Sequence, residues 1–208
     1  MNLLLVDDHA LIRQGLRIAF QEAGGFAVLS EAATGAGALA ALASRRCDAV
    51  IMDINLPDIN GLDVIRTMRD RGDRTPVLVL SMHSEESLGY RAIRAGADGY
   101  LSKDAAPEEI AHALKQIVAG RKYFSVDVMY SFVNGDGRSG KKLHDQLSDR
   151  EYQVMFGLAR GQSVTQIADT LRISPNTVST YRTRVLEKLG VDSNAALTRY
   201  ALIHKLID

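Results

Sequence analysis

The chain of 208 residues contains one cysteine, Cys47, and no tryptophan. A single cysteine excludes an internal disulfide and any zinc site built from thiolates. With 17 glycines and 4 prolines, the chain has too few of either for a collagen-like or low-complexity protein. No run approaches the roughly 18 consecutive apolar residues that cross a bilayer, and the early acidic residues do not fit a signal peptide. We therefore expect a cytoplasmic protein that does not bind a membrane.

The chain also lacks a net charge, but its two halves differ in sign. Residues 1–120 carry 12 basic and 16 acidic side chains, whereas residues 121–208 carry 13 and 9. A basic second half indicates that this part of the chain meets a polyanion. The excess is small, so charge alone does not decide the function.

Five short apolar runs, separated by amphipathic segments, occupy the first 120 residues. Runs of four or five apolar residues without alternation predict strands that are buried on both faces, as in a parallel sheet. Pro107, followed by two acidic residues, marks the start of the last helix in this region. The pattern predicts a doubly wound α/β domain over residues 1–120, with a five-stranded parallel sheet in the order 2-1-3-4-5.

The rest of the chain contains only helical signals after a linker. Residues 121–146 are predicted to form this linker, because glycine and charged residues are frequent in it, with a possible short helix near 126–133. Residues 147–208 are predicted to form an all-α domain of four helices. Within it, two short helices joined by a tight turn are typical of a helix-turn-helix.

Capping residues support the boundaries of these helices. Ser148 and Glu151 form a predicted capping box in front of an apolar run. Ser174 followed by Pro175 predicts a sharp helix start, and Gly190 predicts where that helix ends.

Carboxylates follow two neighbouring strands of the predicted sheet. The first strand ends at Asp7 and Asp8, and the third ends at Asp53. Ligands of such sheets bind beyond the carboxyl ends of the strands, where the strand order reverses. Two carboxylates ~4 Å apart repel by about 4 kcal/mol at an effective dielectric constant of about 20, so the cluster needs a cation. Oxygen ligands with retained waters favour Mg²⁺.

Two further polar residues follow the remaining strands, since the fourth strand ends at Ser81 and the fifth leads to Lys103. A metal ion, a hydroxyl and an ammonium group around one carboxylate supply what phosphoryl transfer needs, namely charge neutralisation and positioning. A carboxylate can itself be the nucleophile and form an aspartyl phosphate. Any one of these residues could be a helix cap or a solvated side chain, but together they favour a phosphoryl-acceptor site.

Two glycine-rich segments suggest an alternative function, a nucleotide-dependent enzyme built on the α/β domain. Residues 35–40 resemble a dinucleotide-binding fingerprint, because they follow a strand and open a helix. Residues 135–141 nearly match a P-loop, but Lys142 stands where serine or threonine must hold Mg²⁺. Neither segment accounts for the acidic residues, Ser81 or Lys103.

These motifs resemble a known family in both halves of the chain. Residues 1–120 resemble the receiver domain of two-component response regulators through Asp7, Asp8, Asp53, Pro57, Gly61, Ser81, Tyr100 and Lys103. Residues 147–207 resemble the LuxR-type DNA-binding domain through residues 147–151, 167–168, 173–174, 177–178 and 188–191. Together they are similar to response regulators of the NarL/FixJ class.

The resemblance implies that Asp53 accepts a phosphoryl group from a histidine kinase. It implies that Mg²⁺ is held by the carboxylates of Asp8 and Asp53. The backbone carbonyl of Asn55 and, through water, Asp7 would complete the metal site.

The resemblance also implies how phosphorylation is sensed and what it controls. Ser81 and Lys103 would contact phosphate oxygens, and Tyr100 would turn inward in the phosphorylated state. The protein would then dimerise, bind double-stranded DNA and meet RNA polymerase. It would have no enzymatic activity beyond self-phosphorylation from small donors and autodephosphorylation.

The helix over residues 174–189 is the candidate for DNA recognition. At 100° per residue, Val178, Tyr181, Val185 and Leu189 share one stripe, which we expect to face the core. Amides, hydroxyls and arginines outside that stripe suit base edges and phosphates in a major groove. A solvated helix face would look the same, so the helix-turn-helix context decides. The candidate contacts are Thr165, Asn176, Ser179, Thr180, Arg182, Thr183 and Arg184.

The chain departs from the family pattern on this helix and has a candidate dimer helix after it. Family members usually carry lysine where Ser179 stands and asparagine-lysine at residues 164–165, so fewer phosphate contacts are expected here. Each lost contact lowers the slope of log K against log salt by about 0.9. The resemblance places the dimer contact on the last helix, at Leu197, Tyr200, Ala201 and His204.

Overall fold

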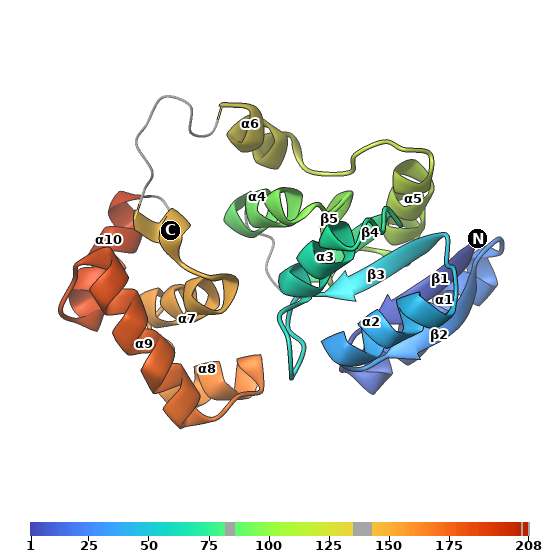
Figure 1. Ribbon diagram of the computed structural model, residues 1–208. Coiled ribbons are helices and arrows are strands. Elements are labelled where there is room, and N and C mark those ends of the chain that lie inside the picture. Colours follow the sequence, from blue (N-terminus) through green and yellow to red (C-terminus); the bar gives the residue numbers. More distant parts are fainter. Residues whose placement is uncertain (82–85, 135–142, 205, 208) are drawn as a thin grey trace. The chain divides into compact units, whose positions relative to one another are not determined.

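The computed structural model describes residues 1–81, 86–134, 143–204 and 206–207. The chain divides into two compact units, Met1–Val133 and Asn134–Asp208 (Figure 1). Among the described residues, no helix combines the length and the apolar character needed to cross a membrane. The functional domain boundaries at residues 120 and 147 stay a prediction.

The first unit is built on a five-stranded, all-parallel sheet in the order β2-β1-β3-β4-β5, which confirms the predicted topology. Both β3 and β4 are buried along their whole length, which explains why their sequences are unbroken apolar runs. The strands are β1 (Asn2–Val6), β2 (Ala27–Ala32), β3 (Ala49–Asp53), β4 (Val77–Ser81) and β5 (Gly99–Ser102).

Helices cover both faces of this sheet (Figure 1). Helices α1 and α5 pack together on one face, where Leu3 and Leu5 join Phe20 and Leu114 in a buried cluster. Helix α3 packs between α2 and α4, and its apolar residues are buried. The helices are α1 (Ala10–Ala23), α2 (Gly35–Ser44), α3 (Gly61–Asp70), α4 (Glu86–Ala95) and α5 (Pro107–Val118).

Helix α6 (Val126–Asn134) corresponds to the short helix predicted within the linker, and it packs against α4. The segment before α6 pairs with the edge of the sheet, where the Tyr100 N–H donates to the Tyr123 carbonyl at 2.9 Å. Gly89 of α4 allows the close approach, because a Cβ there would lie 2.6 Å from Val128 Cγ2. The first part of the predicted linker therefore packs as part of the first unit.

The second unit is helical, as predicted, and its helix starts are capped. Ser148 and Glu151 form the expected capping box, and Gly190 ends α9 with a φ of 64°. A second capping box, between Ser163 and Gln166, was not predicted. The elements are the 3₁₀ helix η1 (Leu143–Gln146), α7 (Asp149–Ala159), α8 (Val164–Leu171), α9 (Pro175–Leu189) and α10 (Asn194–Ile203).

Candidate functional site

Three carboxylates meet at the carboxyl edge of the sheet, where β1 and β3 run side by side. Asp7, Asp8 and Asp53 each offer one oxygen, and His9 offers a ring nitrogen, all within 4.8 Å of one another. Asp7 and Asp53 are both 2% exposed. Three acidic groups and an imidazole at this spacing can hold a divalent cation.

Lys103 lies inside this cluster. Its Nζ is 2.6 Å from Asp7 Oδ2 and 2.7 Å from Asp53 Oδ2, and its side chain is almost fully buried. The Lys103 backbone is fixed as well, because its N–H donates to the carbonyl of Ser81 at 2.7 Å. The ammonium group therefore bridges two carboxylates that would otherwise repel each other.

Burial raises the pKa of the Asp53 carboxyl above its ordinary value. The Lys103 ammonium opposes this increase, whereas the neighbouring Asp7 adds to it. The Asn55 N–H donates to Asp53 Oδ1 at 3.1 Å. Positive charge close to Asp53 therefore favours the ionised form of this carboxyl, against the effect of its burial. The use of the Asn55 carbonyl as a metal ligand stays a prediction.

His9 and Arg13 also contact the cluster, and neither was among the predicted site residues. His9 Nδ1 lies 3.0 Å from Asp7 Oδ1 and 2.8 Å from Asp8 Oδ1. Arg13 donates to the backbone carbonyl of Asp7 at 2.6 Å. A signal for His9 is present in the sequence, because it directly follows the acidic pair and three carboxylates require a counter-charge.

Ser81 and Tyr100 lie on the two strands beyond β3. Ser81 ends β4 and is 1% exposed, and Tyr100 of β5 is 8% exposed. Tyr100 is thus buried in this structure, which is the placement that the resemblance assigns to the phosphorylated state. Their roles in phosphate binding and switching stay predictions.

The start of α2, where the dinucleotide-binding alternative was placed, already holds an anionic side chain. The Asp58 carboxylate accepts hydrogen bonds from the N–H groups of Gly35 (2.8 Å) and Ala36 (2.9 Å). A Cβ at Gly35 would lie 2.8 Å from Val64 Cγ2, so this glycine allows α2 to pack on α3. The donors that a pyrophosphate would use are therefore occupied. The P-loop-like segment 135–142 lies outside the described residues.

We expect Asp58→Ala to lower the free energy of unfolding by about 1 kcal/mol at pH 7, because the N–H groups of Gly35 and Ala36 at the start of α2 lose the carboxylate that accepts their hydrogen bonds. Partial burial raises the pKa of Asp58, but the N–H groups of Ala36 and Gly35 outweigh it, and the pKa is lowered overall. A lowered carboxyl pKa stabilises the fold above the ordinary value of about 3.9 and ceases to do so as the pH falls through the folded value. Urea titrations at several pH values should show the difference from the wild type shrinking in acid. A difference that does not change with pH would contradict this.

In the second unit, α9 presents one apolar and one polar face. Val178, Val185 and Leu189 are buried as expected, whereas Tyr181 is only half-buried. Arg182 is half-buried, and its Nε donates to Asn194 Oδ1 of α10 at 2.8 Å. The other candidate DNA contacts are exposed on α8 and α9, namely Thr165, Asn176, Ser179, Thr180, Thr183 and Arg184.

The hydroxyl groups on this polar face donate hydrogen bonds to backbone carbonyls of α9 itself. Ser179 donates to the Pro175 carbonyl at 3.0 Å, and Thr180 donates to the Asn176 carbonyl at 3.0 Å. Thr183 donates to the Ser179 carbonyl at 3.2 Å. The hydroxyl oxygens therefore face solvent chiefly as acceptors, which suits the amino groups of cytosine and adenine.

The candidate dimer residues of α10 need a correction. Leu197 and Ala201 are 0% exposed, in a helix that packs on α7, so their side chains face the core of their own unit and not a partner. Tyr200 and His204 are half-buried and pack against His144 of η1, whose Nδ1 lies 3.0 Å from the Tyr200 hydroxyl. The spacing of Leu197 and Ala201 is that of a core stripe, and a dimer contact through Tyr200 and His204 stays a prediction.

Both parts of the chain match known families. Residues 3–115 match the response regulator receiver domain, and residues 145–201 match the bacterial regulatory proteins of the luxR family. The two matched segments contain the acidic cluster and the helix-turn-helix, respectively.

Relatives with the same two-part organisation are similar over nearly the full length. Response regulator UvrY of Escherichia coli strain K12 is 34% identical over 208 residues, covering 99% of this chain and 95% of UvrY. Response regulator GacA of Pseudomonas aeruginosa is 32% identical over 210 residues, covering 100% of this chain and 98% of GacA. RcsB from Salmonella enterica serovar Typhimurium, solved with promoter rprA and BeF3⁻, gives a TM-score of 0.64 at 24% identity, covering 96% of this chain and 97% of RcsB. That last likeness concerns the fold alone.

Proposed function

Because this chain belongs to the response regulators that join a receiver domain to a luxR-family DNA-binding domain, we propose that phosphorylation of Asp53 controls its binding to DNA. The observation that carries this proposal is the buried cluster in which Lys103 bridges Asp7 and Asp53. If these residues had no chemical role, burying the three charged side chains would only lower the stability of the fold, because each of them loses its hydration.

In the proposed reaction, a carboxylate oxygen of Asp53 forms a bond to phosphorus. The bond between phosphorus and the histidine nitrogen of the kinase breaks, and its electron pair stays on the imidazole. We propose that Lys103, whose Nζ lies 2.7 Å from Asp53 Oδ2, contacts the transferred phosphoryl group together with Ser81 at the end of β4. We propose no enzymatic activity beyond self-phosphorylation from small donors and autodephosphorylation.

The donor set fits the magnesium ion that the receiver family implies, because three carboxylates each offer an oxygen within 4.8 Å of the others, and oxygen is the ligand that Mg²⁺ prefers. We propose that Asp8, Asp53 and the Asn55 carbonyl would hold it directly, with Asp7 acting through water. When bound, the ion would neutralise charge that develops on the phosphoryl oxygens.

We propose a route for the change at Asp53 that runs from β4 through α4 to α6. Phosphorylation adds about −1.5 to −2 charges, which would draw in Lys103 and Ser81. Ser81 ends the strand before α4, and α4 holds α6 through Gly89 and Val128. We propose that a shift of α4 changes how α6 packs against it. This change would alter dimerisation and the DNA binding of the helices that follow.

The proposed partners are a histidine kinase, double-stranded DNA, RNA polymerase and a second copy of this chain in the phosphorylated state. RcsB was solved with a promoter and a phosphomimetic. The exposed polar face of α9 and its capped start support a comparable role in a major groove. We place the protein in the cytoplasm, where such partners are found.

Arg184→Ala should weaken DNA binding by about tenfold and reduce the slope of log K against log salt by about 0.9, as for one lost phosphate contact. Arg184 is exposed on α9 and has no hydrogen bond or ion pair among the described residues, so the fold should not change. Fluorescence anisotropy at several salt concentrations measures both quantities. Arg199→Ala, an equally exposed arginine on α10, is the matched control. Equal losses in the two variants would remove α9 as the recognition helix.

The proposed function is tested by selecting DNA from a random library with and without acetyl phosphate. We expect an enriched sequence with two related half-sites about one helical turn apart, recovered more strongly when the donor is present. Failure to enrich any sequence under either condition would contradict a DNA-binding role.

A further inference from the structure

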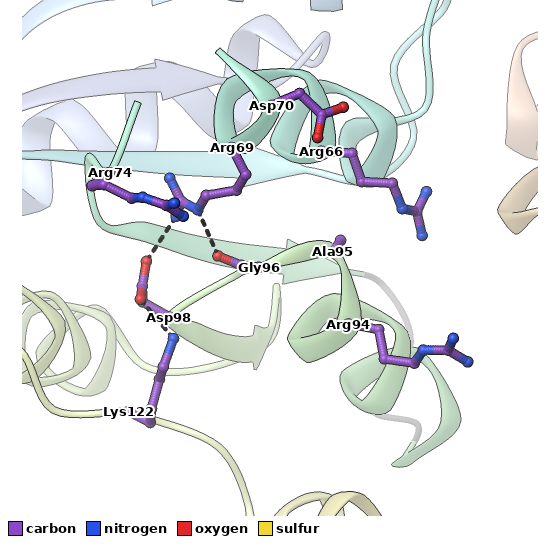
Figure 2. Close-up of a pocket in the computed structure, with 9 residues that line it drawn as sticks. All are labelled: Arg66, Arg69, Asp70, Arg74, Arg94, Ala95, Gly96, Asp98 and Lys122. Atoms are coloured by element: carbon purple, nitrogen blue, oxygen red, sulfur yellow. Dashed lines mark hydrogen bonds and ion pairs between the residues drawn. The ribbon is translucent and has the colours of Figure 1, made fainter. Parts of the chain in front are cut away.

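A second charged cavity lies at the opposite edge of the sheet from Asp53. It has a volume of about 550 Å³ and opens between the ends of α3 and α4, next to the starts of β4 and β5 (Figure 2). Its lining includes five cationic side chains, Arg66, Arg69, Arg74, Arg94 and Lys122. Residues 1–120 are acidic overall, so this gathering of positive charge runs against the charge of its own domain.

Two of the five cations are held by structural contacts. Asp98 Oδ2 lies 3.0 Å from Arg69 Nη2, and Asp98 Oδ1 lies 2.7 Å from Lys122 Nζ. Arg69 also donates to the carbonyls of Gly96, Asp73 and Thr75 at 2.9 to 3.0 Å. These contacts fix the position of the Arg69 side chain. The single carboxylate of Asp98 is shared between Arg69 and Lys122.

The other three cations are spread along the cavity, with Arg74 beside Arg69 and with Arg66 and Arg94 at the other end (Figure 2). Arg66 and Arg94 extend to the same side from α3 and α4 (Figure 2). Arg66 pairs with Asp63 at 2.6 Å, and Arg94 lies over the Tyr90 ring at 5.8 Å. Arg74 is exposed and makes no hydrogen bond or ion pair within the described part of the chain. Among the described residues, Asp70 is the other acid of the lining, so the lining carries an excess of three positive charges, one of which, on Arg66, pairs with Asp63 outside the lining.

An excess of guanidinium groups around a concave surface favours a multiply charged anion. The planar fork of arginine matches phosphate oxygens in pairs, and several arginines spread along one cavity suit a chain of phosphates better than one phosphate. The volume lies within the usual range for small-molecule sites. None of the described residues in the lining is aromatic, so they offer no ring on which a base could stack.

We propose that this cavity binds a polyphosphate group, either inorganic or carried by a nucleoside triphosphate. The proposal does not depend on phosphorylation of Asp53, which lies at the other edge of the sheet. Bound polyphosphate would bridge α3 and α4 and would give the receiver a second input besides its kinase.

Isothermal titration of the full chain with tripolyphosphate, ATP and orthophosphate tests the proposal. We expect tripolyphosphate and ATP to bind with similar affinity and orthophosphate at least tenfold more weakly. A clear preference for ATP would make a nucleotide the source, and a preference for tripolyphosphate would make it inorganic. Absence of tripolyphosphate and ATP binding at millimolar concentration would overturn the proposal.

Variants locate the site and separate it from the rest of the chain. The double variant Arg74→Gln/Arg94→Gln should weaken tripolyphosphate binding at least tenfold, whereas Arg71→Gln, exposed and outside the lining, should not. Acetyl phosphate should still label Asp53 in the double variant, which shows an intact receiver fold. Equal binding by the wild type and the double variant would overturn the proposal, as would tight binding of duplex DNA through the same two arginines without any binding of tripolyphosphate.

Discussion

Asp53→Asn abolishes the labelling of the protein by acetyl phosphate and leaves the fold intact. The amide has the shape of the carboxylate but cannot form the acyl phosphate. Asp7 is as buried as Asp53 and also contacts Lys103, so it is the acceptor that the experiment must distinguish from Asp53. Intact-mass spectrometry with Mg²⁺ and the donor present measures the gain of one phosphoryl group. Circular dichroism checks the fold.

The matched control is Asp104→Asn, an exposed carboxylate beside Lys103 in sequence. This variant should be labelled like the wild type. Unchanged labelling of Asp53→Asn would remove Asp53 from its role, and a shift of the label to Asp7 would show that the pocket is correct but the acceptor is wrong.

Gly61→Ala destabilises the first unit by about 3 kcal/mol, at the upper end of what overpacking usually costs. Gly61 opens α3 directly above the end of β3, and a Cβ there would lie 2.1 Å from the Asp53 carbonyl oxygen. The nearest atoms all belong to backbone, so no side chain can move aside. The strand end that carries Asp53 must shift, and labelling by acetyl phosphate should fall as well. Thermal and urea unfolding measure the loss of stability.

Gly15→Ala is the control for Gly61→Ala. Gly15 lies within α1, and a Cβ there would meet nothing within 4 Å. This substitution should stabilise the protein by about 0.5–1 kcal/mol, since alanine favours a helix over glycine. If both variants lose stability equally, the close approach of α3 to Asp53 is not the cause.

The sheet and the acidic pocket could be predicted because both follow from local patterns. Buried parallel strands leave unbroken apolar runs, and the strand order places the ends of β1 and β3 together. The residues that directly follow those runs must then meet. His9 escaped this reasoning because only the carboxylates were considered, although an imidazole beside them is part of the same cluster.

Contacts between distant segments could not be predicted in the same way. The spacing of Leu197 and Ala201 shows that one face of α10 is buried, but not whether its own unit or a partner covers that face. The short helix near 126–133 could be expected from its own residues. Its packing against α4, however, depends on Gly89, which is far away in the sequence. The hydrogen bonds from the Gly35 and Ala36 N–H groups to Asp58 likewise join residues that are 23 and 22 positions apart in the sequence.

The most direct test of the account is the affinity of the full chain for its selected duplex before and after treatment with acetyl phosphate. A coupling of about 1–3 kcal/mol predicts that phosphorylation tightens binding by roughly 5- to 150-fold, while Asp53→Asn shows no change. Equal affinity in the two states of the wild type, or the same response in Asp53→Asn, would contradict control of DNA binding by phosphorylation of Asp53.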